Sequence, residues 1–222
     1  FDDYQNFVLN QAVHLNELTW SGLARAAQSS GAGPTGRPVA QITFALNYLL
    51  GGVNPWGYKL IGVLIHAANS LLVLLLVVRV ARLFDPTLSK RTVTYFGLAV
   101  ALLWALHPLN VSTVLYVVQR MTLLAGTFTL LTLICYVRFR ERLSSLRPLG
   151  IALWLLGLSV LTILGIYAKE TAILTPLFVL LIEYIAFGFA CENKRCQTAV
   201  RGIFLSLILI PALWFVGTTL LD

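Results

Sequence analysis

The sequence predicts an all-α fold, a polytopic bundle of membrane-spanning helices. Three observations lead to this prediction. Of the 222 residues, 58% are hydrophobic and 11% are charged, whereas about 25% of residues are charged in soluble domains. Long apolar runs alternate with short polar segments, and the mean hydropathy is +0.83. Eleven of the sixteen Lys and Arg residues fall in three short stretches between apolar runs, at residues 79–91, 138–147 and 194–201.

The three basic stretches predict the orientation of the chain. Short loops rich in Lys and Arg stay on the cytoplasmic side of a membrane, so all three are placed inside. Residues 1–57 and the alternate turns then face the opposite, outer compartment. Because the basic residues flank apolar helices, the net charge of +7 indicates contact with anionic lipid head groups rather than with nucleic acid.

The apolar runs predict about six spans. A spanning helix needs about 20 apolar residues, and most of the runs reach this length. The second run is shorter, and we expect it to end at His107–Pro108 because proline disfavours helix in the residue before it. The predicted spans are residues 60–78, 93–106, 111–137, 149–168, 171–190 and 202–221.

The long polar segment before the first span is predicted to be an ordered outer domain, residues 1–57, followed by a transmembrane domain, residues 58–222. Scattered apolar residues predict an amphipathic helix at the membrane interface over residues 11–28. Residues 39–50 are too few to span and predict a second interfacial helix. The chain starts on the outer side without a signal peptide and stops after a span, so we expect a fragment of a longer polytopic protein.

The three cysteines predict no disulfide and no metal site. Cys135 lies inside an apolar run, and Cys191 and Cys196 flank a loop that we assign to the reducing side of the membrane. A C-x4-C pair without a nearby histidine is a poor metal signature. The sequence also has no aspartate-rich cluster, so we predict neither a divalent metal nor another cofactor.

Asp2 and Asp3 are the leading candidates for catalysis. Two adjacent carboxylates at a membrane surface repel each other and lose part of their hydration, which raises one pKa and makes a usable general base. The alternative is a pair of ordinary interfacial acids.

Three basic residues, Arg37, Arg120 and Lys169, lie on the predicted outer side beside apolar helices. A cation at that depth is costly unless it is paired. The pairing is either internal, as Lys169 with Glu170 or Arg120 with an acid on a neighbouring helix, or with a lipid-borne phosphate, which a guanidinium binds at two points. The early end of the second run at His107–Pro108 favours the phosphate, because it leaves a recess near Arg120.

Three further polar residues lie within predicted spans. For His66 and Asn69, one turn apart, we expect hydrogen bonds between helices rather than a metal site. Glu183 needs a partner in its span, and we expect a structural pair.

Several short motifs occur together in an order that resembles a known family: FDDY (1–4), RP (37–38), FALNY (44–48), GGVNPWGY (51–58), HAAN (66–69), ALHP (105–108), VVQR (117–120) and AKET (168–171). The set resembles the transmembrane-and-TPR O-mannosyltransferases and is similar to the protein O-mannosyltransferases of the GT-C superfamily. On this resemblance the chain is expected to be a bacterial relative in the inner membrane, active on the periplasmic face.

The resemblance implies an inverting transferase that moves a sugar from a polyprenyl-phosphate donor to an acceptor hydroxyl, typically of protein Ser or Thr. Asp2 or Asp3 would act as the base, and a TPR domain would follow residue 222 and recruit partners. Relatives often carry a histidine where this chain has Lys59, so the role of that histidine does not transfer. The donor-binding set implied for this chain is Arg37, His107, Gln119, Arg120, Lys169 and Glu170.

Two other functions fit the sequence. A non-catalytic membrane subunit of a larger complex predicts that the outer charges are satisfied by one another or by a partner chain. A transporter for lipid-linked sugars predicts a polar route through the membrane, which the clustering of charges at one face disfavours.

Overall fold

The computed structural model confirms the all-α membrane bundle. It describes all residues except 1–7, 32, 192–193, 195, 206–216 and 218–222, and the described part contains helices and no strand. The α-helices are α1 (Trp20–Ala27), α2 (Pro38–Gly51), α3 (Pro55–Phe84), α4 (Lys90–Ala105), α5 (Asn110–Leu115), α6 (Arg120–Arg142), α7 (Pro148–Ala168) and α8 (Thr175–Ile182). Short 3₁₀ turns are η2 (Gln11–Val13), η3 (Val117–Gln119), η4 (Leu143–Ser145) and η5 (Glu170–Leu174), and η6 (Glu183–Phe187) is a π-helical turn.

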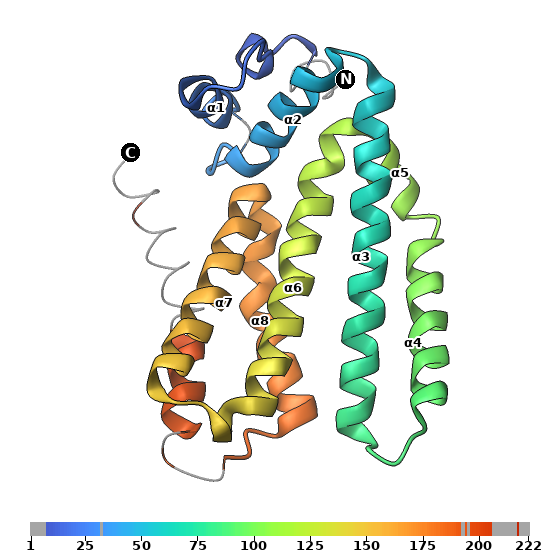
Figure 1. The fold of residues 1–222 in the computed structure, drawn as a ribbon, viewed down its shortest axis with the longest axis vertical. Helices are drawn as coiled ribbons and strands as arrows, with labels where there is room; N and C mark the ends of the chain where they lie inside the picture. Colours follow the sequence, from blue (N-terminus) through green and yellow to red (C-terminus); the bar gives the residue numbers. More distant parts are fainter. Residues whose placement is uncertain (1–7, 32, 192–193, 195, 206–216, 218–222) are drawn as a thin grey trace.

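Four helical segments in the described part are long and apolar enough to cross a membrane: Pro55–Phe84, Val117–Ser145, Pro148–Ala168 and Glu170–Phe187. The chain is therefore an integral membrane protein. Helix α6 is central and packs against α3 on one side and α7 and α8 on the other, while α4 packs on α3 (Figure 1). The count of six spans is not confirmed, because α4 is short and most of residues 202–221 lies outside the described residues.

The predicted early end of the second apolar run is confirmed. Helix α4 has 16 residues, so it is about 24 Å long, less than the roughly 30 Å of a bilayer core. Side chains hydrogen-bond to two carbonyl groups of the last turn. His66 Nε2 lies 2.9 Å from Ala105 O, and Asn110 Nδ2 donates to Trp104 O at 2.6 Å. The helix therefore stops without leaving these backbone acceptors unpaired.

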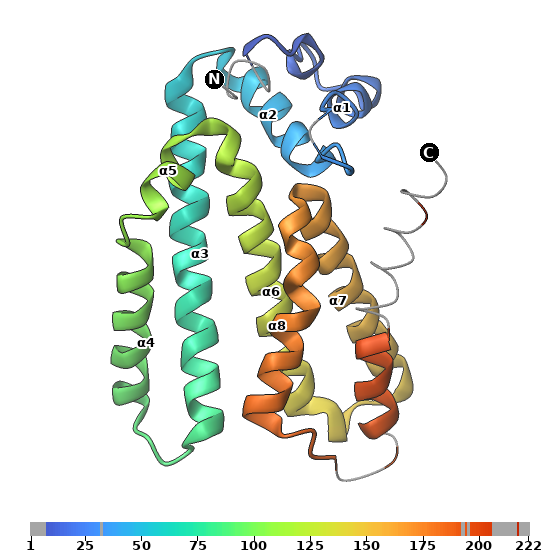
Figure 2. The same cartoon turned by 180° about the vertical axis from the view of Figure 1, so that it is seen from behind.

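The prediction of one continuous span over residues 111–137 is wrong at its start. Helix α5 ends at Leu115, Tyr116 is extended, and α6 begins only at Arg120 after the η3 turn. Between Pro108 and the start of α6 at Arg120 the chain contains no Gly or Pro, so the sequence gave no sign of a break there. The break changes the direction of the chain between α4 and α6 (Figures 1 and 2).

Helix α2 crosses one end of the bundle, as expected for an interfacial helix, and α1 packs on α2 (Figure 2). A core of apolar side chains joins this α2 end to α3 and α6, including Val13, Ala40, Phe44, Tyr58 and Met121. The helix predicted over residues 11–28 forms only in its second half: η2 precedes a turn, and α1 begins at Trp20 after its N-cap, Thr19.

The opposite, basic end holds a buried ion pair and a disulfide. Glu183 accepts hydrogen bonds from Tyr136 Oη at 2.6 Å and from Arg140 Nε and Nη2 at 2.7 and 2.8 Å, so the structural pair predicted for Glu183 is confirmed. The prediction of no disulfide is wrong, because Cys191 is bonded to Cys196. Their Cα atoms are 5.5 Å apart across a turn that the spacing did not reveal.

Candidate functional site

Four charged residues gather at the α2 end and are called here the polar cluster: Arg37, Arg120, Lys169 and Glu170. Arg37, just before α2, pairs with Glu170, the first residue of η5. Its Nη2 lies 3.0 Å from Glu170 Oε2, and its Nε lies 3.1 and 3.2 Å from the two carboxylate oxygens. Thr35 Oγ1 donates to the same carboxylate at 3.0 Å. Glu170 therefore ties the segment before α2 to the end of α7.

The backbone of Arg37 is strained. Its φ of 51° and ψ of 48° lie in the left-handed helical region, which residues other than glycine rarely occupy. The following residue, Pro38, restricts the backbone of Arg37 further. Such a conformation costs on the order of 1–3 kcal/mol and persists only where the surroundings hold it. Here the Glu170 carboxylate holds the guanidinium, and Gly33, with φ of +70°, leaves room for that carboxylate because a Cβ there would overlap it.

Lys169 does not pair with Glu170, the internal partner that the sequence offered as one alternative. Its Nζ donates to Thr122 Oγ1 at 2.7 Å, and the Thr122 hydroxyl in turn donates to Gln119 Oε1 at 2.7 Å. Within the described residues no carboxylate lies in ion-pair distance of Lys169, because its neighbour Glu170 binds Arg37. Burial lowers the pKa of Lys169, and the nearby Arg37 charge lowers it further, against an opposing effect of Glu170.

Arg120 is almost completely buried, with 1% of its surface exposed. Its Nη1 donates to Thr43 O at 3.2 Å, and its Nη2 donates to Asn47 Oδ1 and Tyr58 O at 2.8 and 3.0 Å. The guanidinium also lies over the rings of Phe44 and Tyr58, at 4.9 and 5.4 Å from their centroids. Arg120 therefore joins α2, α3 and α6 at one level of the bundle.

The polar cluster contains three cations and one carboxylate, so its charges do not balance. Arg37 and Glu170 neutralise each other, and the charges of Arg120 and Lys169 remain. Arg120 is covered by α2 and by two rings, whereas Lys169 is partly exposed. A buried or half-buried cation without a counter-ion favours binding of an anion. Of the four residues, Lys169 is best placed to bind an anion, because it is partly exposed and its charge is not neutralised by a described carboxylate.

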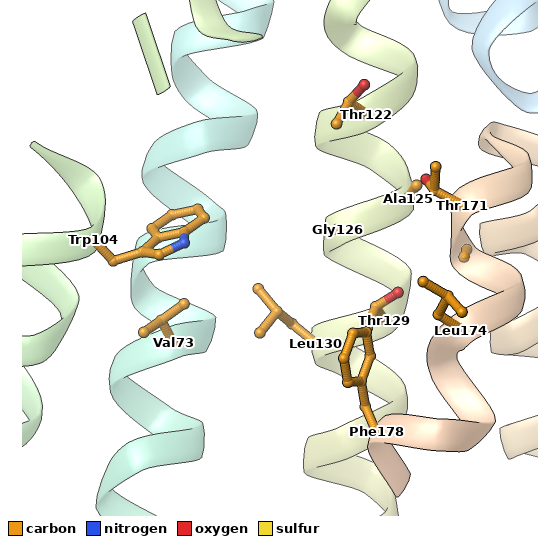
Figure 3. A pocket seen from close by; sticks show the side chains of 11 residues that line it. Val73, Trp104, Thr122, Ala125, Gly126, Thr129, Leu130, Thr171, Leu174 and Phe178 are labelled. Atoms are coloured by element: carbon orange, nitrogen blue, oxygen red, sulfur yellow. The ribbon is translucent and has the colours of Figure 1, made fainter. Parts of the chain in front are cut away.

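A cavity of about 350 Å³ lies beside the polar cluster and is called here the lateral groove. Helices α3 and α4 contribute residues on one side and η5 and α8 on the other, with α6 between them (Figure 3). Thr122 belongs both to the lining of the groove and to the Lys169 network. The lining is chiefly apolar: Val73, Trp104, Thr122, Ala125, Gly126, Thr129, Leu130, Thr171, Ala172, Leu174 and Phe178.

The structure brings part of the predicted donor-binding set together. Arg37, Lys169 and Glu170 are adjacent, and Gln119 joins them through Thr122. His107 is exposed in the turn after α4, where its Nδ1 accepts from Leu109 N at 3.3 Å, and no described hydrogen bond links it to the polar cluster. The predicted catalytic pair, Asp2 and Asp3, lies outside the described residues, so its role stays a prediction.

The predicted contact of Arg120 with a lipid phosphate also stays a prediction, although its guanidinium has neutral protein partners on three elements. The hydrogen bonds predicted for His66 and Asn69 are confirmed, with Asn69 Nδ2 donating to Leu123 O at 2.9 Å. Among the described residues, no group of three or more His, Cys, Asp or Glu side chains could hold a metal ion.

Sequence reasoning missed Thr35, Thr122 and the lining of the lateral groove. Thr122 follows the VVQR motif by two residues, and this nearness to Gln119 and Arg120 was the one available signal. Trp104 and Phe178 are ordinary members of apolar runs. Only the folded arrangement, with α4 packed on α3 and α8 packed on α6, shows that both line one groove (Figure 3).

The whole chain is similar to protein O-mannosyl-transferase TMTC2 of Mus musculus, with 29% identity over 231 residues, which is 26% of that protein. It is 37% identical to protein O-mannosyl-transferase Tmtc2 of Drosophila melanogaster over 147 residues, covering 65% of this chain and 14% of the relative. With Tmtc1 of the same organism, the identity is 31% over 78% of this chain and 18% of the relative. The chain thus spans about a quarter or less of these relatives. No protein-family profile and no solved structure matches it.

Proposed function

We propose that this chain is the membrane-embedded part of a protein O-mannosyltransferase. It would transfer mannose from a polyprenyl-phosphate donor to a Ser or Thr hydroxyl of a protein acceptor, by an inverting GT-C-type reaction. The observation that carries the proposal is the cation of Lys169, which has no described carboxylate partner and stands beside a membrane groove. The names of the relatives supply the sugar and the acceptor.

The positive charge of the polar cluster suits the donor. A phosphate that leaves an anomeric carbon gains negative charge, and fixed cations stabilise that charge without a proton transfer. Lys169 would bind the phosphate directly, with Gln119 and Thr122 orienting the ammonium group. The buried positive charge of Arg120 would add to the electrostatic attraction of the phosphate, while its hydrogen bonds to Thr43 and Asn47 hold α2 in place.

The proposed reaction is a single displacement. Asp2 or Asp3 accepts the proton of the acceptor hydroxyl, and the hydroxyl oxygen attacks the anomeric carbon. The bond between that carbon and the phosphate oxygen breaks, and the lipid phosphate leaves with the electron pair. Attack opposite the leaving group inverts the anomeric configuration. The scheme needs no divalent metal, because protein cations take the place of one.

The proposal places the α2 end in the extracytoplasmic compartment and the basic end in the cytoplasm. The three basic stretches support this orientation, since short Lys- and Arg-rich loops remain inside. The inner membrane of a bacterium, with a periplasmic active face, remains the proposed location, and a C-terminal TPR domain with partner subunits remains the proposed context. The three relatives reported above are animal proteins.

Transfer by the full-length protein tests the proposal. The protein is reconstituted in lipid with a polyprenyl-phosphate mannose and a peptide that carries Ser and Thr hydroxyl groups. Mass spectrometry then measures the mass of the peptide. We expect addition of one hexose by the wild type, and loss of addition in Asp2→Asn or Asp3→Asn at unchanged folding. Wild-type turnover by both variants would remove the base assignment, and an inactive wild type would remove the enzyme proposal.

The alternative of a non-catalytic membrane subunit is favoured by one observation, the mutual neutralisation of Arg37 and Glu170. A scaffold predicts that its charges are satisfied by one another or by a partner chain, and this pair is satisfied within the chain. Lys169 has a neutral hydroxyl as its described side-chain partner, so a scaffold would need a partner chain to neutralise it. A transporter is disfavoured, since the lining of the lateral groove is chiefly apolar.

A further inference from the structure

We propose that Arg37 is a positioning residue for anion binding: by holding the carboxylate of Glu170, it keeps the adjacent ammonium group of Lys169 open to a phosphate. This inference rests on the proposed function for the identity of the anion. It gives Arg37 an indirect role, in which its guanidinium does not contact the phosphate.

Glu170 follows Lys169 in the chain, and the two charges would cancel if the side chains met. In the structure the carboxylate faces Arg37 instead. Arg37 Nε lies 3.2 and 3.1 Å from Oε1 and Oε2, and its Nη2 lies 3.0 Å from Oε2. Thr35 Oγ1 donates a further bond to Oε1 at 3.0 Å. Both carboxylate oxygens therefore have donors, and none of these donors is Lys169.

The segment before α2 is built around this carboxylate. The Thr35 hydroxyl accepts from the backbone N–H of Arg37 at 3.2 Å, so it links Arg37 to the oxygen that it donates to. Both Gly33 and Arg37 have positive φ, and a Cβ at Gly33 would overlap the carboxylate. Because a strained backbone persists only where its contacts hold it, the pair is a fixed feature of this segment.

Arg37 has few donors left for a phosphate, whereas Lys169 has two. Besides Nε and Nη2, which bind Glu170, Arg37 places Nη1 at 3.3 Å from Met121 Sδ. Lys169 donates to Thr122 Oγ1 at 2.7 Å, and an ammonium group has three N–H donors. Within the described residues, the other two donors of Lys169 have no partner. A phosphate therefore finds open donors at Lys169.

The charges of Arg37 and Glu170 act on Lys169 in opposite directions. Burial lowers the pKa of Lys169, the charge of Arg37 lowers it further, and the charge of Glu170 raises it. From α6, Lys169 is contacted by the uncharged Thr122, while Arg120 on that helix donates to α2 and α3. In the described part of the chain, the balance at Lys169 is therefore set by Arg37 and Glu170.

This balance predicts a rescue. The two cations and one carboxylate of Arg37, Lys169 and Glu170 carry one net positive charge. Arg37→Gln removes that net charge and releases the carboxylate toward Lys169, so phosphate binding is expected to weaken. Adding Glu170→Gln restores the net positive charge, now on Lys169 alone. The second change would not rescue a variant that had lost a direct phosphate contact or a structural contact.

Binding of a polyprenyl phosphate without sugar to the full-length protein tests this inference. Native mass spectrometry over a lipid titration gives Kd. We expect Arg37→Gln to raise Kd about tenfold or more, and the double variant with Glu170→Gln to return to within about threefold of the wild type. The control is Arg25→Gln, which removes an exposed charge on α1 and should change Kd less than about twofold.

A double variant that binds as weakly as Arg37→Gln would overturn the inference. If Arg37→Gln does not fold, Glu170→Gln alone provides the test: it leaves two cations without the acid and should tighten binding, so weaker binding would overturn the inference. The pKa of Lys169 is a readout without ligand, measured by NMR of methyl-labelled lysines and assigned with Lys169→Arg. Arg37→Gln should raise this pKa and the double variant should lower it again, and a pKa that does not move would also overturn the inference.

Mannose transfer by the same proteins separates this inference from the proposed function. Rescue of lipid-phosphate binding in a protein whose wild type transfers no mannose would refute the proposed reaction and retain the role of Arg37. Transfer by the wild type without rescue in the double variant would refute the role of Arg37 and retain the reaction. A wild type that binds no polyprenyl phosphate would refute the role of Arg37 as well.

Discussion

At the scale of single residues, Lys169 and Glu170 are neighbours in sequence with separate partners. Glu170 binds Arg37 and Thr35, while Lys169 turns to Thr122. The sequence predicted that these charges were costly and needed partners, and it offered a pair of Lys169 with Glu170 as one alternative to a lipid-borne phosphate. It could not show Arg37 as the partner, because 133 residues separate Arg37 from Glu170 and only the fold brings them together.

We expect Lys169→Gln to lower kcat/KM for the lipid-phosphate donor by about 100-fold, since removing one fixed positive group from a developing anion costs about that much. Lys59→Gln is the matched control, because Lys59 is exposed at the start of α3. Kinetics of both variants with one peptide acceptor check the prediction. Unchanged kcat/KM in Lys169→Gln would remove Lys169 from the donor site.

Donor binding is expected to depend on pH through the same residue. Lys169 binds a phosphate only when protonated, and burial together with Arg37 lowers its pKa below the ordinary lysine value of 10.5. Affinity should therefore be greatest on the acidic side of this lowered pKa and fall as the pH rises through it. Titration of Kd against pH, with Lys169→Arg as the comparison, measures the effect. An arginine keeps its proton, so loss of affinity at the same pH in that variant would contradict the assignment.

The Arg37–Glu170 pair is expected to contribute about 1 kcal/mol to stability, because both side chains are partly exposed and solvent weakens the attraction. A double-mutant cycle with Arg37→Ala, Glu170→Ala and both changes isolates this coupling. Thermal unfolding in detergent is the measurement. Additive effects of the two single changes would show that the pair contributes nothing.

At the scale of elements, apolar run lengths and proline positions predicted the ends of α2, α4 and α7 to within three residues, whereas α3 extends five residues before and six beyond the predicted span. They failed where the chain breaks without a glycine or proline, between α5 and α6, and where two cysteines meet across a turn. The predicted need of Glu183 for a partner was correct. The partner, Arg140, lies on α6 and had been assigned to a basic loop, so only the packing of α8 on α6 identifies it.

Breaking that ion pair is expected to destabilise the basic end. Arg140→Ala leaves the carboxylate of Glu183 buried without its cation, which costs about 3–5 kcal/mol. The double variant Arg140→Met with Glu183→Leu replaces both charges by apolar groups and should cost much less. Arg142→Ala, on the exposed side of the same helix, is the control. Thermal unfolding of the three proteins checks the order, and a double variant less stable than Arg140→Ala would contradict it.

At the scale of the whole molecule, composition and charge distribution predicted an all-α membrane protein, and the structure confirms it. The predicted orientation in the membrane rests on the three basic stretches, and this orientation decides which compartment the polar cluster faces. The lateral groove could not be predicted, because its lining comes from α3, α4, α6, η5 and α8 together. No single helix among these carries a pattern that identifies a cavity.

Labelling of single cysteines from outside tests the orientation. Leu18→Cys places an exposed thiol in the segment before α1, and Leu88→Cys places one in the turn between α3 and α4. In intact cells, a maleimide that does not cross membranes should react at position 18 and reach position 88 only after permeabilisation. The unsubstituted chain gives the background of the native cysteines. The reverse pattern would place the polar cluster in the cytoplasm.

The proposed site holds the phosphate of a lipid-linked donor at Lys169, beside the lateral groove. Photocrosslinking of the full-length protein with a polyprenyl-phosphate mannose that carries a photoreactive group in its chain tests this placement. We predict that mass spectrometry finds the label on α6 between Thr122 and Leu130 and on the facing residues of η5 and α8, with competition by the unmodified donor. Label on the outer face of α7 or at the basic end, or label that the donor does not compete, would contradict the account.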